Sequence, residues 1–151
     1  MNAGDLAKRT AGYFAVGLHG LLRSWVQEDL SILLYHRVTD VKPGVPPPGF
    51  SVTPDQFYEQ LHGLQKRGFT FLALTRAIQL AETGKPWPRK PLVVTLDDGF
   101  ENVYLHAWPL LRRLGIPATI FVNTAFLNSN EPFPFDSWGH QYGNDVPAET
   151  Y

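Results

Sequence analysis

Apolar and polar positions alternate along the chain in blocks that predict strands followed by helices. Residues 92–96 are apolar and rich in β-branched side chains, and residues 31–38 begin with a similar apolar run and end in the polar pair His36 and Arg37, so both segments predict parallel strands. Alternating residues predict a further strand over 69–74, and a short apolar run predicts a buried strand over 118–122. The segments between these predicted strands have apolar residues at helical spacing, which predicts helices there. This alternation predicts βαβ units and an α/β fold with a parallel sheet.

Local signals set the boundaries of the predicted helices. Thr53 is expected to cap the helix that follows the first strand, with Pro54 in its first turn and Gln56 completing a capping box. Gly68 is expected to end that helix in a left-handed conformation. A second helix is expected from residue 75 to residue 84. The helix after residue 100 should break near Ala107, because Pro109 cannot donate a backbone hydrogen bond, and Pro109 should open a second helical piece. That piece should end at residues 115–117.

The first 30 residues form a segment of their own. Its apolar side chains recur at helical spacing, which predicts an amphipathic helix packed on the domain: Phe14, Leu18, Leu21, Leu22 and Trp25. Weak contact of residues 6–26 with a membrane surface is the alternative. An uncleaved targeting segment also stays open, since no convincing small-residue cleavage site precedes Arg23. The compartment is left open between the bacterial cytoplasm and the cell-envelope face.

Composition restricts the chemistry that the chain can perform. With 151 residues, 44% of them hydrophobic and 18% charged, the chain is long enough for one domain with a buried core. A net charge of −1 argues against nucleic-acid binding, which usually needs a basic excess. There is no cysteine, so disulfides and thiolate metal ligands are excluded, and any metal must be held by Asp, Glu and His.

The strongest chemical signal is a pair of adjacent carboxylates at the end of the central predicted strand. Asp97 and Asp98 follow residues 92–96 directly, and Gly99 follows them. Ligand sites of parallel sheets form at the carboxyl ends of strands. Neighbouring strand residues point to opposite faces, so the two carboxylates can share a site only if the chain turns at this point, which Gly99 permits. Two interpretations stay open: a site with a cation and a base, or a turn that closes the strand.

Three motifs in order resemble the polysaccharide deacetylase family (NodB-homology domain, carbohydrate esterase type). Residues 95–100, T-L-D-D-G-F, resemble the first motif of that family, T-F-D-D-G-Y/F. Residues 32–38, I-L-L-Y-H-R-V, resemble the strand that opens many members, and residues 115–122, G-I-P-A-T-I-F-V, the strand after the first motif. The resemblance covers residues 31–138. It implies an incomplete distorted (β/α) barrel, because such barrels need about 200 residues or more.

The resemblance also implies a function and roles for individual residues. The implied enzyme is a metal-dependent hydrolase that removes acetyl groups from an N-acetylated polysaccharide. Asp97 matches the general base and Asp98 a ligand of the divalent metal (Zn, or Co, Ni or Mn). His36 is expected to line the substrate site. Independently of the resemblance, the composition of residues 128–138 predicts that Trp138 could stack on sugar faces, with ordinary loop packing as the slightly favoured alternative.

The histidine pair of the family's second motif, H-S/T-x-x-H, is missing from the chain. No two of the five histidines lie three or four residues apart. We therefore interpret residues 31–151 as the N-terminal part of a deacetylase domain with its later motifs missing through truncation. The chain alone is expected to be inactive and to self-associate through exposed strand edges. The alternative is a remnant or glycan-binding module without catalysis that uses Phe133, Phe135 and Trp138. Aspartyl phosphotransfer is disfavoured, since its D-x-D spacing is absent at residues 97–98.

Overall fold

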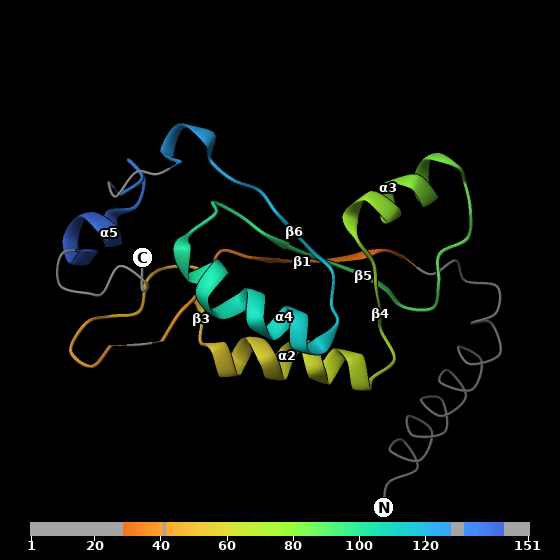
Figure 1. Cartoon of the computed structure of the whole chain (residues 1–151), viewed down its shortest axis with the longest axis horizontal. Coiled ribbons are helices and arrows are strands. Elements are labelled where there is room, and N and C mark those ends of the chain that lie inside the picture. Colours follow the sequence, from red (N-terminus) through yellow and green to blue (C-terminus); the bar gives the residue numbers. More distant parts are fainter. Residues whose placement is uncertain (1–28, 41, 128–131, 144–151) are drawn as a thin grey trace, which may run out of the picture.

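The computed structural model describes residues 29–40, 42–127 and 132–143, and its centre is a parallel sheet (Figure 1). β5 (Pro91–Leu96) is the central strand, and all six of its residues are buried. β1 (Ser31–Tyr35) pairs with one edge of β5, while β4 (Thr70–Phe71) and β6 (Ala118–Ile120) share the other edge. Every pairing is parallel. The predicted α/β fold with a parallel sheet is confirmed, while closure into a barrel stays a prediction.

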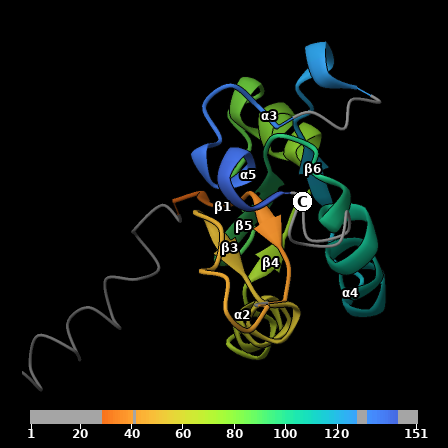
Figure 2. The same cartoon turned by 90° about the vertical axis from the view of Figure 1, so that its left-hand side faces the viewer.

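One face of the sheet carries the main hydrophobic core. The register pairs Leu33 with Val94 and Tyr35 with Leu96, so these four side chains share a face. Helices α2 (Pro54–Lys66) and α4 (Trp108–Leu114) cover this face. α3 (Leu74–Glu82) lies on the opposite side of the sheet in both views (Figures 1 and 2). Helices thus lie on both sides of the sheet, although Ile32 and Leu34 on β1 are each 54% exposed.

The predicted boundaries of α2 are confirmed. The Thr53 side chain accepts a hydrogen bond from the backbone N–H of Gln56 at 3.2 Å, and the Gln56 side chain accepts one from the N–H of Thr53 at 3.0 Å. This reciprocal pair satisfies two amides at the start of the helix. At the other end, Gly68 adopts φ 77°, as a residue just beyond a helix commonly does.

The helix after the acidic turn has two pieces that meet at Ala107, but the chain stays helical there. A π-helical turn, η1 (Val103–Ala107), runs without interruption into α4. Pro109 lies in the first turn of α4, where a missing N–H costs least. Pro109 thus opens the second piece as predicted, while the π turn before it replaces the expected break near Ala107. Gly115 ends α4 with φ 65°, as predicted.

Several other boundaries were predicted wrongly. Residues 31–38 are two strands, because the chain leaves the main sheet at His36 and β2 (Arg37–Val38) pairs with β3 (Ser51–Val52) in a second, parallel sheet. β4 and β6 are shorter than the runs 69–74 and 118–122 that predicted them, and α3 begins one residue before 75. Two short helices were not predicted: η2 (Thr124–Phe126) and α5 (Ser137–Tyr142).

The amphipathic helix expected within residues 1–30 lies almost wholly outside the described residues. Among the helices that the structure does describe, none is long and apolar enough to cross a membrane.

Candidate active site at the carboxyl ends of the strands

The two adjacent carboxylates lie in a tight turn at the end of β5. The backbone N–H of Asp97 donates to the carbonyl oxygen of Tyr35 at 2.9 Å, so pairing with β1 extends one residue beyond the strand. Asp98 and Gly99 then adopt φ 72° and 76° in succession. Asp tolerates this left-handed region better than most residues, and Gly adopts it freely. The turn that a shared site requires therefore begins directly after Asp97.

Gly99 is required here for its size as well as its conformation. A Cβ atom built on Gly99 would lie 2.9 Å from Cγ1 of Val122, which follows β6. The loop after β6 also approaches the turn through its backbone, since the N–H of Asn123 points at the carbonyl oxygen of Asp98 at 3.4 Å. The acidic turn thus lies between the ends of β1 and β6. Asp97 and Asp98 are both partly accessible to solvent.

His36 lies beside this turn. It follows Tyr35 directly, and the hydrogen bond between Tyr35 and Asp97 places the backbones of His36 and Asp97 next to each other at the ends of paired strands. The imidazole is half-buried and stacks on the ring of Phe50, with 5.2 Å between ring centroids and 29° between planes. The structure therefore places the backbone of His36 next to that of Asp97, and the predicted role of His36 in lining the substrate site stays a prediction.

Tyr35 anchors the strand end that carries His36. Its ring is buried against Phe57, and its hydroxyl donates to Oε1 of Gln60 at 2.8 Å. Burial raises the pKa of the Tyr35 hydroxyl above its usual value, because the phenolate would lose its hydration. Tyr35 is thus a neutral hydrogen-bond donor at neutral pH, which suits an anchoring role.

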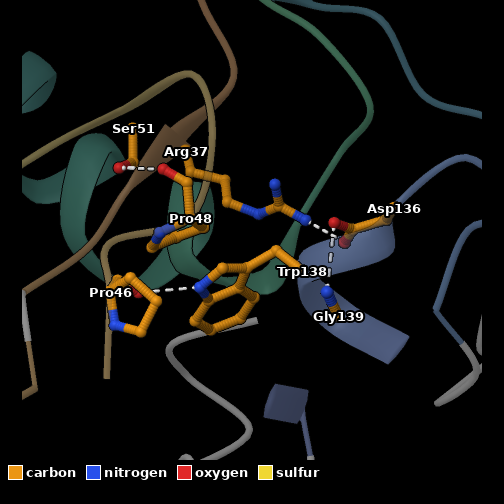
Figure 3. Close-up of polar contacts among 7 residues, drawn as sticks. All are labelled: Arg37, Pro46, Pro48, Ser51, Asp136, Trp138 and Gly139. Carbon is orange, nitrogen blue, oxygen red and sulfur yellow. Dashed lines mark hydrogen bonds and ion pairs between the residues drawn. The ribbon is translucent and has the colours of Figure 1, made fainter. Parts of the chain in front are cut away.

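A buried ion pair that the sequence analysis missed holds α5 against the end of β2. Arg37 and Asp136 form this pair, and their side chains are only 6% and 7% exposed (Figure 3). The guanidinium also lies over the ring of Phe100, 3.8 Å from its centroid, which favours a desolvated cation. The other carboxylate oxygen of Asp136 accepts from the N–H of Gly139 at 3.2 Å and caps α5. The N-cap pattern D-S-W-G at 136–139 could have indicated Asp136. Arg37 lies within the motif of residues 32–38, but nothing in the sequence links it to Asp136.

Trp138 contacts the loop that precedes β3. Its indole N–H donates to the carbonyl oxygen of Pro46 at 2.7 Å, as Figure 3 shows, and its ring is half-buried. This contact gives Trp138 a packing role and leaves its predicted role in substrate binding as a prediction. Phe133, which the alternative of a glycan-binding module used, is buried at 7% exposure because it packs against the rings of Phe100 and Phe126. It is not available to a sugar.

Asn102 joins the helix after the acidic turn to β2. Its side chain is fully buried, and its Oδ1 accepts from the backbone N–H of Val38 at 3.0 Å. A buried amide in this position helps to fix the direction in which the helix leaves the turn. Sequence reasoning passed over Asn102 because nothing in the apolar pattern of residues 100–114 distinguishes it from a solvent-exposed polar residue.

The described residues do not make a complete metal site. Asp97 and Asp98 offer carboxylate oxygens, which suit a divalent cation. Within residues 29–40, 42–127 and 132–143, however, no group of three or more His, Cys, Asp or Glu side chains is placed to hold a metal ion. A catalytic metal site of the zinc type usually has about three protein ligands. The metal implied by the resemblance would therefore need donors beyond those described.

Comparison with known proteins supports the class of enzyme that these motifs indicated. A family model described as polysaccharide deacetylase matches residues 84–146, which include the whole acidic turn. Among solved structures, the chain is similar to IcaB from Ammonifex degensii (32% identity, TM-score 0.55, covering 63% of this chain and 38% of that one). It is also similar to the Streptococcus pyogenes deacetylase PplD (25% identity, TM-score 0.57, covering 64% and 43%). The comparisons confirm the resemblance to the polysaccharide deacetylase family.

More specific relatives are the poly-β-1,6-N-acetyl-D-glucosamine N-deacetylases of staphylococci. The protein of Staphylococcus epidermidis is 34% identical over 80 residues, which are 53% of this chain and 27% of that protein. The protein of Staphylococcus aureus strain MSSA476 is 33% identical over 75 residues. The match thus spans about a quarter of the length of these curated relatives.

Proposed function

We propose that the chain carries one edge of the active site of a polysaccharide N-deacetylase. The observation that supports this most strongly is the acidic turn itself. Asp97 and Asp98 follow the buried central strand, the chain reverses within the next two residues, and the turn lies within the matched residues 84–146. A rigid strand that ends in partly accessible carboxylates is how parallel sheets present catalytic groups.

In this proposal Asp97 is the general base. Its backbone is fixed by the hydrogen bond to Tyr35, so its position does not depend on the loop that follows. A carboxylate held in this way can take the proton of a water molecule as the oxygen of that water attacks the carbonyl carbon of an acetamide group. The C–N bond then breaks as the leaving nitrogen takes up a proton, for which the one now held by Asp97 is the source. Acetate is released, the sugar keeps a free amine, and Asp97 is again a carboxylate.

Asp98 has a different proposed role. By the resemblance it is the one metal ligand that this part of the chain supplies, and the positive φ of Asp98 turns the chain away from the direction of the strand. Because the described residues offer an incomplete donor set, no proton transfer in this proposal passes through a metal. The proposal needs only that Asp97 and Asp98 are not interchangeable.

The proposed substrate is a polysaccharide of N-acetylated sugars. The staphylococcal relatives are named for poly-β-1,6-N-acetyl-D-glucosamine, which makes that polymer the first substrate to test. A net charge of −1 gives the chain no basic surplus that would favour a strongly anionic glycan.

A chimeric enzyme tests the proposal. Residues 84–146 of this chain replace the corresponding residues of the Staphylococcus epidermidis deacetylase, and acetate release from poly-β-1,6-N-acetyl-D-glucosamine is measured. We expect the chimera to be active and its Asp97→Asn variant to lose activity at least about 100-fold. Glu101→Gln is the matched control, because Glu101 is an exposed acid next to the turn. A folded chimera without activity, or one unaffected by Asp97→Asn, would contradict the proposal.

A further inference from the structure

Phe50 is an exposed aromatic residue in an unfavourable backbone conformation. Its φ is 54°, in the left-handed region, and 84% of its surface is exposed, the highest value among the large hydrophobic residues described. A residue with a bulky side chain rarely adopts a positive φ. Glycine adopts it without strain, yet the chain has Phe at this position, directly after Gly49. Strain at an exposed position gains nothing for the core, so it points to a function for the ring.

The backbone around Phe50 holds this conformation in place. The carbonyl oxygen of Phe50 accepts from the N–H of Arg37 at 3.3 Å, and β3 begins at the next residue, where Ser51 pairs with Arg37. The hydroxyl of Ser51 donates to the carbonyl oxygen of Pro48 at 2.7 Å, which closes the turn from the other side (Figure 3). The ring is therefore presented by a braced turn.

The Phe50 ring is stacked on His36, next to the proposed base. The two rings lie 5.2 Å apart between centroids with 29° between their planes. His36 in turn lies beside Asp97 at the ends of β1 and β5. The stacked pair thus joins a strand end next to Asp97 to a ring that is open to solvent and accessible to a polymer.

We propose that His36 and Phe50 form a stacking subsite for a pyranose ring of the polysaccharide, next to the residue that is deacetylated. One face of a pyranose carries C–H groups and packs on an aromatic face, as apolar groups do generally. The subsite rests on the proposed function for its substrate class. It adds a contact outside residues 84–146 that positions the polymer relative to Asp97.

Binding of a glycan to the full 151-residue chain tests the subsite. The ligand is a β-1,6-linked N-acetylglucosamine pentamer, titrated while the imidazole signals of His36 and the ring signals of Phe50 are followed by NMR. We expect the Kd to rise about fivefold to tenfold in Phe50→Ala, which loses one aromatic contact. In Phe50→Trp the Kd should stay within about twofold of the parent.

Two further variants separate binding from backbone strain and general surface effects. Phe50→Gly should raise Tm above that of Phe50→Ala, because Gly adopts φ 54° freely, yet it should weaken binding equally. Tyr104→Ala removes a ring that is 70% exposed on η1, and it should leave the Kd unchanged.

The subsite is refuted if Phe50→Ala binds as the parent does, if Phe50→Gly does, or if the parent chain shows no binding. The chimera test involves neither His36 nor Phe50, so the two proposals can fail separately. Binding that depends on Phe50 together with an inactive chimera would support the subsite and reject the deacetylase. An active chimera together with binding that does not depend on Phe50 would support the deacetylase and reject the subsite.

Discussion

Removing the charge of Asp136 should destabilise the chain by about 3 kcal/mol. The Arg37 and Asp136 side chains are almost fully buried, so Asp136→Asn leaves a guanidinium without its counter-charge. Breaking such a buried pair costs about 3–5 kcal/mol in the free energy of unfolding. Two contacts limit the loss: Asn caps a helix about as well as Asp, and Phe100 still covers the cation. The lower end of the range is therefore expected.

Urea denaturation measures this loss. With a slope of about 1.5 kcal/mol per M, the midpoint should fall by about 2 M. Asp55→Asn is the matched control, because Asp55 is exposed in the first turn of α2, and we expect a change of at most about 1 kcal/mol from it. The double variant Arg37→Met with Asp136→Leu should recover most of the loss, since it removes both charges. A midpoint shift below about 0.5 M in Asp136→Asn would refute this account of α5.

Three further predictions concern Gly99 in the acidic turn, the buried Tyr35 and the outer strand β1. Gly99→Ala should lower the free energy of unfolding by about 2 kcal/mol, more than Gly84→Ala, whose Cβ would meet nothing within 4 Å; equal losses in a denaturation assay would contradict this. Burial raises the pKa of Tyr35, so its contribution to stability is complete below about pH 10 and is lost as pH rises further. In Tyr35→Phe the free energy of unfolding should fall less steeply above about pH 10 than in the parent chain. An equally steep fall would contradict the role of Tyr35 in it. Ile32 and Leu34 on β1 are each 54% exposed, and the double variant Ile32→Lys with Leu34→Lys should reduce self-association in sedimentation velocity. A parent chain that stays monomeric would exclude pairing through this strand edge.

Local signals predicted the parts of the fold that depend on local chemistry. The capping box of Thr53 and Gln56 needs residues three apart, and Gly68 and Gly115 end their helices through their own conformation. The acidic turn was predicted for the same reason, because a buried β-branched run that stops at Asp97 can be recognised without knowing what packs on it.

Long-range contacts account for most of what the sequence could not predict. The end of β1 at Tyr35 results from pairing between β2 and β3, which joins residues 37–38 to residues 51–52. The position of α5 depends on an ion pair whose members are 99 residues apart. Phe50 is one of ten phenylalanines in the sequence, and neither its conformation nor its partner His36 has a local signature.

The separate roles of Asp97 and Asp98 are the central claim, and a metal titration of the chimera tests it most directly. Zn²⁺ binding is measured by calorimetry in the parent chimera and in its Asp97→Asn and Asp98→Asn variants, with acetate release recorded for each. Asp97→Asn should lose turnover at least about 100-fold while its affinity for Zn²⁺ stays within about threefold. Asp98→Asn should weaken Zn²⁺ binding by about tenfold or more. Equal loss of metal affinity in the two variants would contradict the claim.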